Sequence, residues 1–130
     1  MTTPHYFITG ASGCIGHYLL ENLLESTDAH LDCLIRNKAK LHKRYHKHPR
    51  ITIHKGKLDD IKAQESVVKN CDILIHIATA WNDDPYSMEI NYHKTLDLIK
   101  YASKGKCKKI IYYSTASILS GNNKANPDAL

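Results

Sequence analysis

Apolar residues along this chain are concentrated in short segments that alternate with stretches of helical spacing. These segments have the length of strands and cover 6–9, 31–35, 51–54, 71–78 and 109–114. Between them, apolar side chains recur every three or four positions over 14–26, 64–69 and 88–102. Strands that alternate with helices on short connections imply right-handed crossovers and a parallel sheet. The pattern predicts an α/β fold, a Rossmann-type doubly wound parallel sheet of five strands in the order 3-2-1-4-5, with helices on both faces.

Two segments depart from this alternation. The basic segment 38–48 has weak helical periodicity through Leu41 and Tyr45 and ends before Pro49, so a short and largely exposed helix is expected there. Residues 121–130 show no periodicity. We expect one domain over 1–120, followed by a loop over 121–130 at which the chain stops.

Three glycines follow the first apolar run, and a helical pattern begins immediately after them. Gly10, Gly13 and Gly16 are spaced three apart, and Ser12 falls near the position of the second glycine in the G-x-G-x-x-G fingerprint. Glycine lets the backbone turn sharply, admits a pyrophosphate close to the main chain and lets helix and strand touch. The amides at the helix start then face an anion. We expect a dinucleotide to be bound by Gly10, Ser12, Gly13, Cys14, Ile15 and Gly16.

In a doubly wound sheet the ligand lies outside the C-terminal strand ends, near the switch point between the first and fourth strands. Arg36 follows the second strand, where an enzyme that selects NAD usually has Asp or Glu to bind the ribose hydroxyls. A guanidinium can instead hold a 2′-phosphate, with help from Asn37 and Lys38. The sequence therefore predicts NADP as the cofactor. NAD is the alternative, if Arg36 stacks on the adenine without discriminating.

Composition indicates a globular protein of a reducing compartment. Apolar residues make up 42% of the 130 and charged residues 24%, as in a globular domain. No apolar run approaches membrane-spanning length and no signal peptide is visible, so we expect a cytoplasmic protein without a membrane partner. The four cysteines form no C-x-x-C pair and are expected to be free thiols: Cys14, Cys33, Cys71 and Cys107.

The net charge of +5 is concentrated between Arg36 and Arg50. This cluster is compatible with phosphate binding near a cofactor and equally with a solvated helix face. Aromatic side chains that could stack on bases are nearly absent from it, so no nucleic acid is expected as a partner. His42 and His46 lie one helical turn apart without a carboxylate or cysteine at ligand spacing, and no metal site is expected.

Five motifs in this order resemble the extended short-chain dehydrogenase/reductase superfamily, in its branch of nucleotide-sugar epimerases, dehydratases and dihydroflavonol-reductase-like enzymes. The motifs lie at 9–16, 56–60, 76–79, 90–91 and 112–117. The resemblance covers the whole chain and implies an NAD(P)-binding domain. It implies cofactor contacts on the adenine side, under the nicotinamide ribose and in the long helix, at Lys57 and Leu58, at Ala78, Thr79 and Ala80, and at Asn91.

The resemblance also implies a catalytic hydroxyl just after the fifth strand, which hydrogen-bonds the substrate oxygen. This position falls on Thr115, or next to Ser117 if the alignment is shifted to match Gly121. Without a substrate role, these hydroxyls would only satisfy backbone groups in a turn. The parent enzyme is expected to act on a small-molecule carbonyl or nucleotide-sugar substrate, and a homodimer is compatible with the family.

Three departures from the family pattern limit what this chain is expected to do. Lys57 replaces the Asp that binds the adenine amino group, and Lys94 replaces a glycine of the long helix. The Tyr-x-x-x-Lys pair that donates and relays a proton is absent, because Tyr101 and Lys104 have the wrong spacing. The C-terminal substrate lobe of the family is not expected within these 130 residues either.

We therefore expect the N-terminal part of an oxidoreductase or epimerase that transfers a hydride to or from nicotinamide, inactive by itself. The alternative from another class is a non-catalytic module that senses a dinucleotide or acts as a scaffold.

Overall fold

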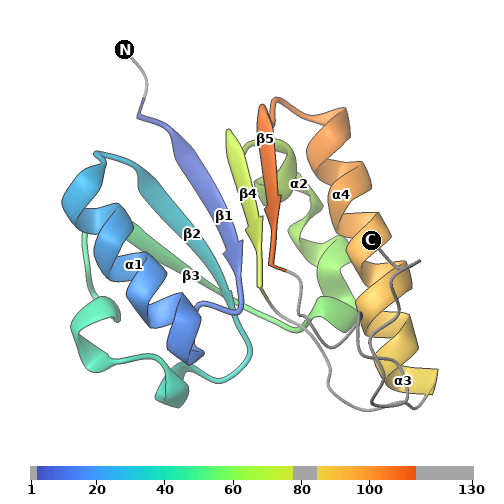
Figure 1. Cartoon of the computed structure of the whole chain (residues 1–130), viewed down its shortest axis with the longest axis horizontal. Coiled ribbons are helices and arrows are strands. Elements are labelled where there is room, and N and C mark those ends of the chain that lie inside the picture. The colour runs from blue at the N-terminus through green and yellow to red at the C-terminus, as the bar shows by residue number, and fades with distance from the viewer. Residues whose placement is uncertain (1–2, 78–84, 114–130) are drawn as a thin grey trace, which may run out of the picture.

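The computed structural model describes residues 3–77 and 85–113, which form a parallel sheet between two layers of helices (Figure 1). The strand order is β3-β2-β1-β4-β5, which confirms the predicted fold class and order. All four strand pairs are parallel. The strands are β1 (His5–Thr9), β2 (His30–Ile35), β3 (Ile51–Lys55), β4 (Ile73–His76) and β5 (Lys109–Tyr112).

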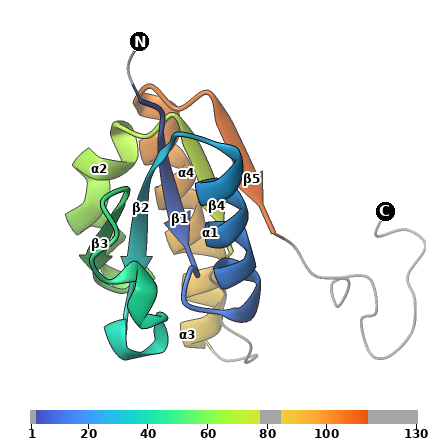
Figure 2. The ribbon, with the colours of Figure 1, turned by 90° about the vertical axis from the view of Figure 1, so that its left-hand side faces the viewer.

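Helix α1 (Cys14–Ser26) covers one face of the sheet, and the remaining α-helices cover the other (Figures 1 and 2). The second layer contains α2 (Glu65–Lys69), α3 (Pro85–Met88), the π-helical segment η4 (Glu89–Lys94) and α4 (Thr95–Lys104). A 3-10 segment that the sequence did not predict, η3 (Leu58–Gln64), connects β3 to α2. No helix in the described part of the chain is long and apolar enough to cross a membrane.

The sheet divides the core into two clusters because successive strand residues point to opposite faces. Ile8 of β1 packs with Leu20 of α1 on one face. Phe7, its neighbour in the strand, packs with Leu74 and Leu98 on the other face. These side chains are fully buried, so β1 is covered on both sides, as expected for the central strand of a parallel sheet.

The carboxyl ends of the central strands meet at one edge of the sheet. Thr9, the last residue of β1, is paired with Leu34 of β2 and with His76 of β4. The segments that leave these strands therefore begin side by side. The glycine turn follows β1 directly, and Arg36 follows β2.

The basic segment 38–48 does not form the single exposed helix expected from its sequence. It contains two 3-10 turns, η1 (Lys38–Lys40) and η2 (Lys43–Tyr45). Each is capped locally: the Asn37 side chain accepts the Ala39 N–H, and His42 Nδ1 accepts the Arg44 N–H. These bonds compete with continuous helix. Apolar side chains of this segment are buried rather than exposed, with Leu41 at 1% and Tyr45 at 3% exposure.

The long helix exists as predicted, but only the end of its expected apolar stripe faces the core, where Ile99 is half-buried and Ala102 is buried. Met88, Tyr92 and Leu96 are 68%, 58% and 48% exposed. Besides Ala102, the buried positions are Ser87, Ile90, Thr95 and Leu98. The step of five from Ile90 to Thr95 crosses the π-helical segment, which adds a residue to the turn. Because of this extra residue, the buried positions on either side of the segment are not separated by three or four residues.

Strand β4 begins two residues later than the apolar run. The Cys71 N–H bonds to the Val68 carbonyl, so Cys71 still belongs to the turn that ends α2. The predicted end of the fourth strand, at residue 78, lies outside the described residues. The predicted end of the fifth strand, at residue 114, lies outside them too.

Candidate functional site

The turn between β1 and α1 needs glycine at two positions for reasons of fold. Gly10 has a φ of 77°, in the left-handed region that L side chains rarely adopt. A Cβ on Gly16 would lie 2.4 Å from the Gly10 carbonyl oxygen and 2.5 Å from backbone atoms of Ala11. Helix α1 therefore rests directly against the turn. The Gly13 N–H closes the turn on the Gly10 carbonyl at 3.2 Å.

The third glycine of the turn has no such constraint. A Cβ on Gly13 would meet only the Gly10 carbonyl oxygen, at 3.5 Å, which is an ordinary contact. Gly13 is the N-cap of α1, and no side chain caps this helix end. The first amides of a helix lack partners within it and carry a partial positive charge. The space that a side chain on Gly13 would fill therefore lies at a helix end that attracts an anion, and this cradle fits a pyrophosphate.

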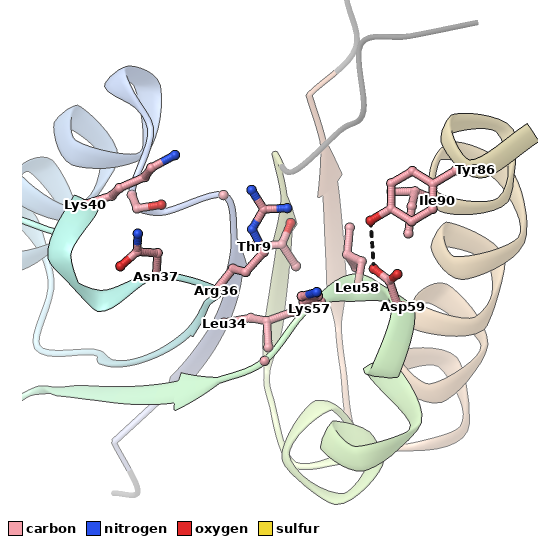
Figure 3. A pocket seen from close by; sticks show the side chains of 13 residues that line it. Thr9, Leu34, Arg36, Asn37, Lys40, Lys57, Leu58, Asp59, Tyr86 and Ile90 are labelled. Carbon is pink, nitrogen blue, oxygen red and sulfur yellow. Dashed lines mark hydrogen bonds between the residues drawn. The ribbon is translucent and has the colours of Figure 1, made fainter. Parts of the chain in front are cut away.

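A cavity of about 320 Å³ lies beside this turn, at the carboxyl edge of the sheet (Figure 3). The end of β1 and its turn contribute Thr9, Gly10 and Ser12 to its wall. The segment that leaves β2 contributes Leu34, Arg36, Asn37 and Lys40. The segment that leaves β3 contributes Gly56, Lys57, Leu58 and Asp59, and the helical layer contributes Tyr86 and Ile90.

Positive charge dominates the polar wall of this cavity. Arg36, Lys40 and Lys57 line it, and within residues 3–77 and 85–113 none of the three forms a side-chain hydrogen bond or ion pair. The acidic residue Asp59 instead accepts a hydrogen bond from the Tyr86 hydroxyl at 3.1 Å. In Figure 3, Asn37 and Lys40 lie on one side of the cavity, Asp59 and Tyr86 on the other, and Arg36 between them. The positive charges of Arg36, Lys40 and Lys57 are therefore available to an anionic ligand.

A buried histidine connects the floor of this cavity to the helical layer. His76 Nδ1 lies 2.6 Å from the Thr9 hydroxyl, and Nε2 lies 2.9 Å from the Thr95 hydroxyl. Thr95 donates its own proton to the Ile90 carbonyl, so it accepts from Nε2–H. Nδ1 therefore accepts from Thr9, whose oxygen also accepts the Ile77 N–H. The neutral ring is satisfied on both sides, and burial lowers the pKa of His76 to about 4.

The structure brings together many of the predicted cofactor contacts. Gly10, Ser12, Arg36, Lys57 and Leu58 line the cavity. Gly13 caps α1, and Cys14, Ile15 and Gly16 form its first turn. Asn91 lies in η4 beside Ile90, is half-buried and does not line the cavity. The remaining predicted residues lie outside the described residues: Ala78, Thr79, Ala80, Thr115 and Ser117.

Several residues that line the cavity were not predicted as site residues, among them Lys40 and Tyr86. Lys40 lines it in place of the expected Lys38, because the turn η1 that begins after Asn37 carries Lys40 back toward the sheet edge. Its position four residues after Arg36, in a basic segment, was the available signal. Tyr86 had no signal, since its place depends on how α3 packs across the cavity.

The histidines of the basic segment serve local structure. His46 Nε2 lies 3.0 Å and 2.8 Å from the carbonyl oxygens of Lys38 and Leu41, and His42 Nδ1 caps η2. Among the described residues, no group of three or more His, Cys, Asp or Glu side chains could hold a metal ion.

Sequence comparison agrees with this geometry. A family model described as "NAD dependent epimerase/dehydratase family" matches residues 6–129. The chain belongs to this family. The match supports a dinucleotide-binding domain of an extended short-chain dehydrogenase/reductase, as the resemblance implied.

The proteins similar to this chain include two solved structures that contain different cofactors. The oxidase ucsJ of Acremonium sp is 35% identical over 65% of this chain and 25% of its own length. A short-chain dehydrogenase/reductase of Veillonella parvula DSM 2008, solved in complex with NADP, has a TM-score of 0.69 and 25% identity, covering 92% of this chain and 51% of that one. The Bordetella bronchiseptica enzyme WbmH, solved with NAD+, has a TM-score of 0.75 and 22% identity, covering 92% and 42%.

The chain thus spans about a quarter of the length of the curated relative and about half or less of the two solved chains. Both solved neighbours bind a nicotinamide dinucleotide, and they do not distinguish NADP from NAD.

Proposed function

We propose that this chain binds NADP in the cavity at the carboxyl edge of its sheet and acts as the cofactor-binding part of a reductase or epimerase. The observation that carries the proposal is the set of three cations, Arg36, Lys40 and Lys57, that line the cavity without ionic partners among the described residues. When bound, the cofactor would exchange a hydride at C4 of its nicotinamide with a carbonyl or hydroxyl carbon of the substrate. The residues of this chain bind and orient it.

The glycine turn would hold the pyrophosphate. Gly13 leaves the N-terminal end of α1 open, and the amides there offer both hydrogen-bond donors and a positive dipole end. Ser12 lines the cavity next to this point and adds a hydroxyl donor. The adenine would lie against the apolar part of the wall, which Leu34, Leu58 and Ile90 provide.

The segment after β2 would recognise the 2′-phosphate. The Arg36 guanidinium can bind a phosphate through two parallel charge-assisted bonds, and Lys40 adds a second positive charge from the same segment. No carboxylate follows β2 to repel the phosphate. One charged hydrogen bond contributes about 1.5 to 3 kcal/mol, or roughly tenfold to a hundredfold in affinity.

In the parent reaction, Thr115 or Ser117 would polarise the substrate oxygen. Both follow β5, whose carboxyl end lies at the cavity edge of the sheet next to β4. A hydroxyl donor at that place stabilises negative charge that develops on the oxygen during hydride transfer. The substrate, a carbonyl compound or a nucleotide sugar, and the proton donor would be held by parts of the protein beyond this sequence.

Calorimetric titration with NADP and with NAD at one salt concentration tests the cofactor assignment. We expect NADP to bind at least tenfold more tightly, because the phosphate adds a charged bond that NAD lacks. Arg36→Ala should reduce this preference to near unity. Arg44→Ala is the matched control, since this arginine of the same segment pairs with Glu21 and does not line the cavity. Equal affinities for both cofactors, or an Arg36→Ala variant that weakens both alike, would refute the assignment to NADP.

A further inference from the structure

Two of the four cysteines lie beside each other at the amino end of the sheet, far from the cavity edge. Cys71 precedes β4, and Cys107 precedes β5. The first residues of these strands, Ile73 and Lys109, are paired in parallel register. Cys71 and Cys107 each lie two residues before these paired positions. The same register, extended beyond the strands, therefore places them opposite each other.

Hydrogen bonds extend this pairing beyond the strands. The Lys106 N–H donates to the Lys69 carbonyl at 3.0 Å, and the Lys108 N–H donates to the Asp72 carbonyl at 2.7 Å. These two bonds bracket the cysteines. Neighbouring strands lie about 4.8 Å apart, and this spacing falls within the Cα separation of about 4.4 to 6.8 Å that disulfides use.

The two side chains also meet. Cys71 is 1% exposed and belongs to the core cluster around Phe7, and half-buried Cys107 packs against the same cluster. The two sulfurs are close enough for the Cys107 side chain to act on the Cys71 thiol. The Cys107 thiol in turn donates to the Lys109 carbonyl at 3.2 Å. Burial, and then the neighbouring Cys107 sulfur, raise the pKa of Cys71 to about 12.

We propose that Cys71 and Cys107 form a reversible disulfide by exchange with a small anionic disulfide such as oxidised glutathione. In the first step the sulfur of the more exposed Cys107, as thiolate, attacks one sulfur of the reagent. This forms a mixed disulfide and releases one glutathione thiolate. In the second step Cys71 loses its proton, and its sulfur attacks the Cys107 sulfur and releases the second glutathione. Two protein thiols are thereby oxidised, and one glutathione disulfide is reduced to two thiols.

The surroundings of Cys107 favour the first step. Four exposed lysines flank it in sequence, namely Lys104, Lys106, Lys108 and Lys109. Their charges attract a disulfide that carries carboxylates, so the rate of mixed-disulfide formation should fall as salt is added. The second step is slower, because the buried Cys71 thiol is rarely ionised. The mixed disulfide should therefore appear before the internal disulfide.

Closing this bond would tie the start of edge strand β5 to the start of β4. The loop that it closes, 71–107, contains α3, η4 and α4. A cross-link across such a loop reduces the freedom of the unfolded chain and raises the thermal midpoint of the oxidised protein.

The test is to incubate the folded chain with oxidised glutathione at pH 8, quench with acid and map the peptides by mass spectrometry without reduction. We expect a cross-linked peptide pair containing Cys71 and Cys107, which disappears after dithiothreitol. Cys14→Ser should leave it unchanged, and Cys107→Ser should abolish it. Reaction of Cys33 with glutathione would indicate unfolding, because this side chain is fully buried in the other core cluster.

Three outcomes would overturn the proposal: a glutathione adduct that stays on Cys107, a cross-link that involves Cys14 or Cys33, or a Cys71–Cys107 pair that forms only as Cys33 also reacts. The thermal midpoint of the oxidised chain gives an independent measurement, and a fall in it on oxidation would also contradict the proposal.

Discussion

At the scale of residues, the three glycines of the turn have different tasks although the sequence presents them as one motif. Gly10 and Gly16 are needed by the backbone, because the first has a positive φ and a Cβ on the second would overlap the Gly10 carbonyl oxygen. Gly13 has space for a side chain within the protein, and only a ligand would make that side chain unfavourable. Spacing alone could not separate these tasks.

Substitution of Gly13 and Gly16 should therefore give opposite results. Gly13→Val should abolish cofactor binding measured by calorimetry, with a thermal midpoint close to that of the wild type. Gly16→Val should lower the thermal midpoint strongly, because its side chain would overlap the turn backbone. Unchanged cofactor affinity in Gly13→Val would show that the pyrophosphate lies elsewhere.

The buried histidine should make the stability of the protein depend on pH in a defined window. The pKa of His76 is about 4 in the folded protein, against a usual 6.5. Between these values the unfolded chain binds a proton that the folded chain does not, so the free energy of unfolding falls as the pH drops from 6.5 toward 4. The full difference amounts to about 3 kcal/mol.

Denaturant titrations of the wild type and of His76→Gln at several pH values measure this effect. Glutamine does not titrate, so the variant should lose less stability across the window, although it is less stable at pH 7. His93→Gln, at an exposed position, is the control and should follow the wild type. Parallel pH profiles for wild type and His76→Gln would contradict the assignment.

At the scale of elements, the π-helical segment η4 sets which side of the long helix is buried. Thr95 donates to the carbonyl of Ile90, five residues before it, and accepts from His76. This hydroxyl thus connects the wide turn to the sheet. The prediction from apolar periodicity assumed turns of 3.6 residues, so it placed Met88, Tyr92 and Leu96 on the buried side, where the structure has them exposed.

Removing that hydroxyl should destabilise the fold without changing side-chain size. Thr95→Val leaves the Nε2–H of His76 unsatisfied in a buried place, which costs about 1 to 3 kcal/mol of unfolding free energy. Thr95→Ser keeps the hydroxyl and should recover most of the loss. Urea denaturation monitored by circular dichroism provides the comparison, and a Thr95→Val variant as stable as the wild type would show that the bond contributes nothing.

At the scale of the whole molecule, the sequence predicted the sheet because each strand is a short segment rich in apolar residues between clear breaks. It predicted Arg36 correctly as a lining residue because the position after β2 is set by topology. Lys40 and Tyr86 depend on the course of η1 and on the packing of α3, which no local pattern encodes. The prediction of one exposed helix over the basic segment was wrong for a similar reason, because the caps by Asn37 and His42 favour two short turns.

The purified chain should bind cofactor without catalysing a reaction. It contains the proposed cofactor cavity, but its sequence has no Tyr-x-x-x-Lys pair to supply the proton. Absorbance at 340 nm should stay constant when the chain is mixed with NADPH and a panel of carbonyl compounds. Turnover that Thr115→Ala removes would show that another group donates the proton.

The position of β5 at the end of the sheet has a practical consequence for handling the protein. Ile110 and Tyr112 are exposed on this strand, as is Tyr113 directly after it, and in the described part of the chain no further strand pairs with its outer edge. Free backbone donors and acceptors on an apolar edge are a template for pairing with another chain. The lysines that precede and begin the strand repel a second copy, and salt screens that repulsion. Concentrated, high-salt solutions are therefore where this chain will aggregate first.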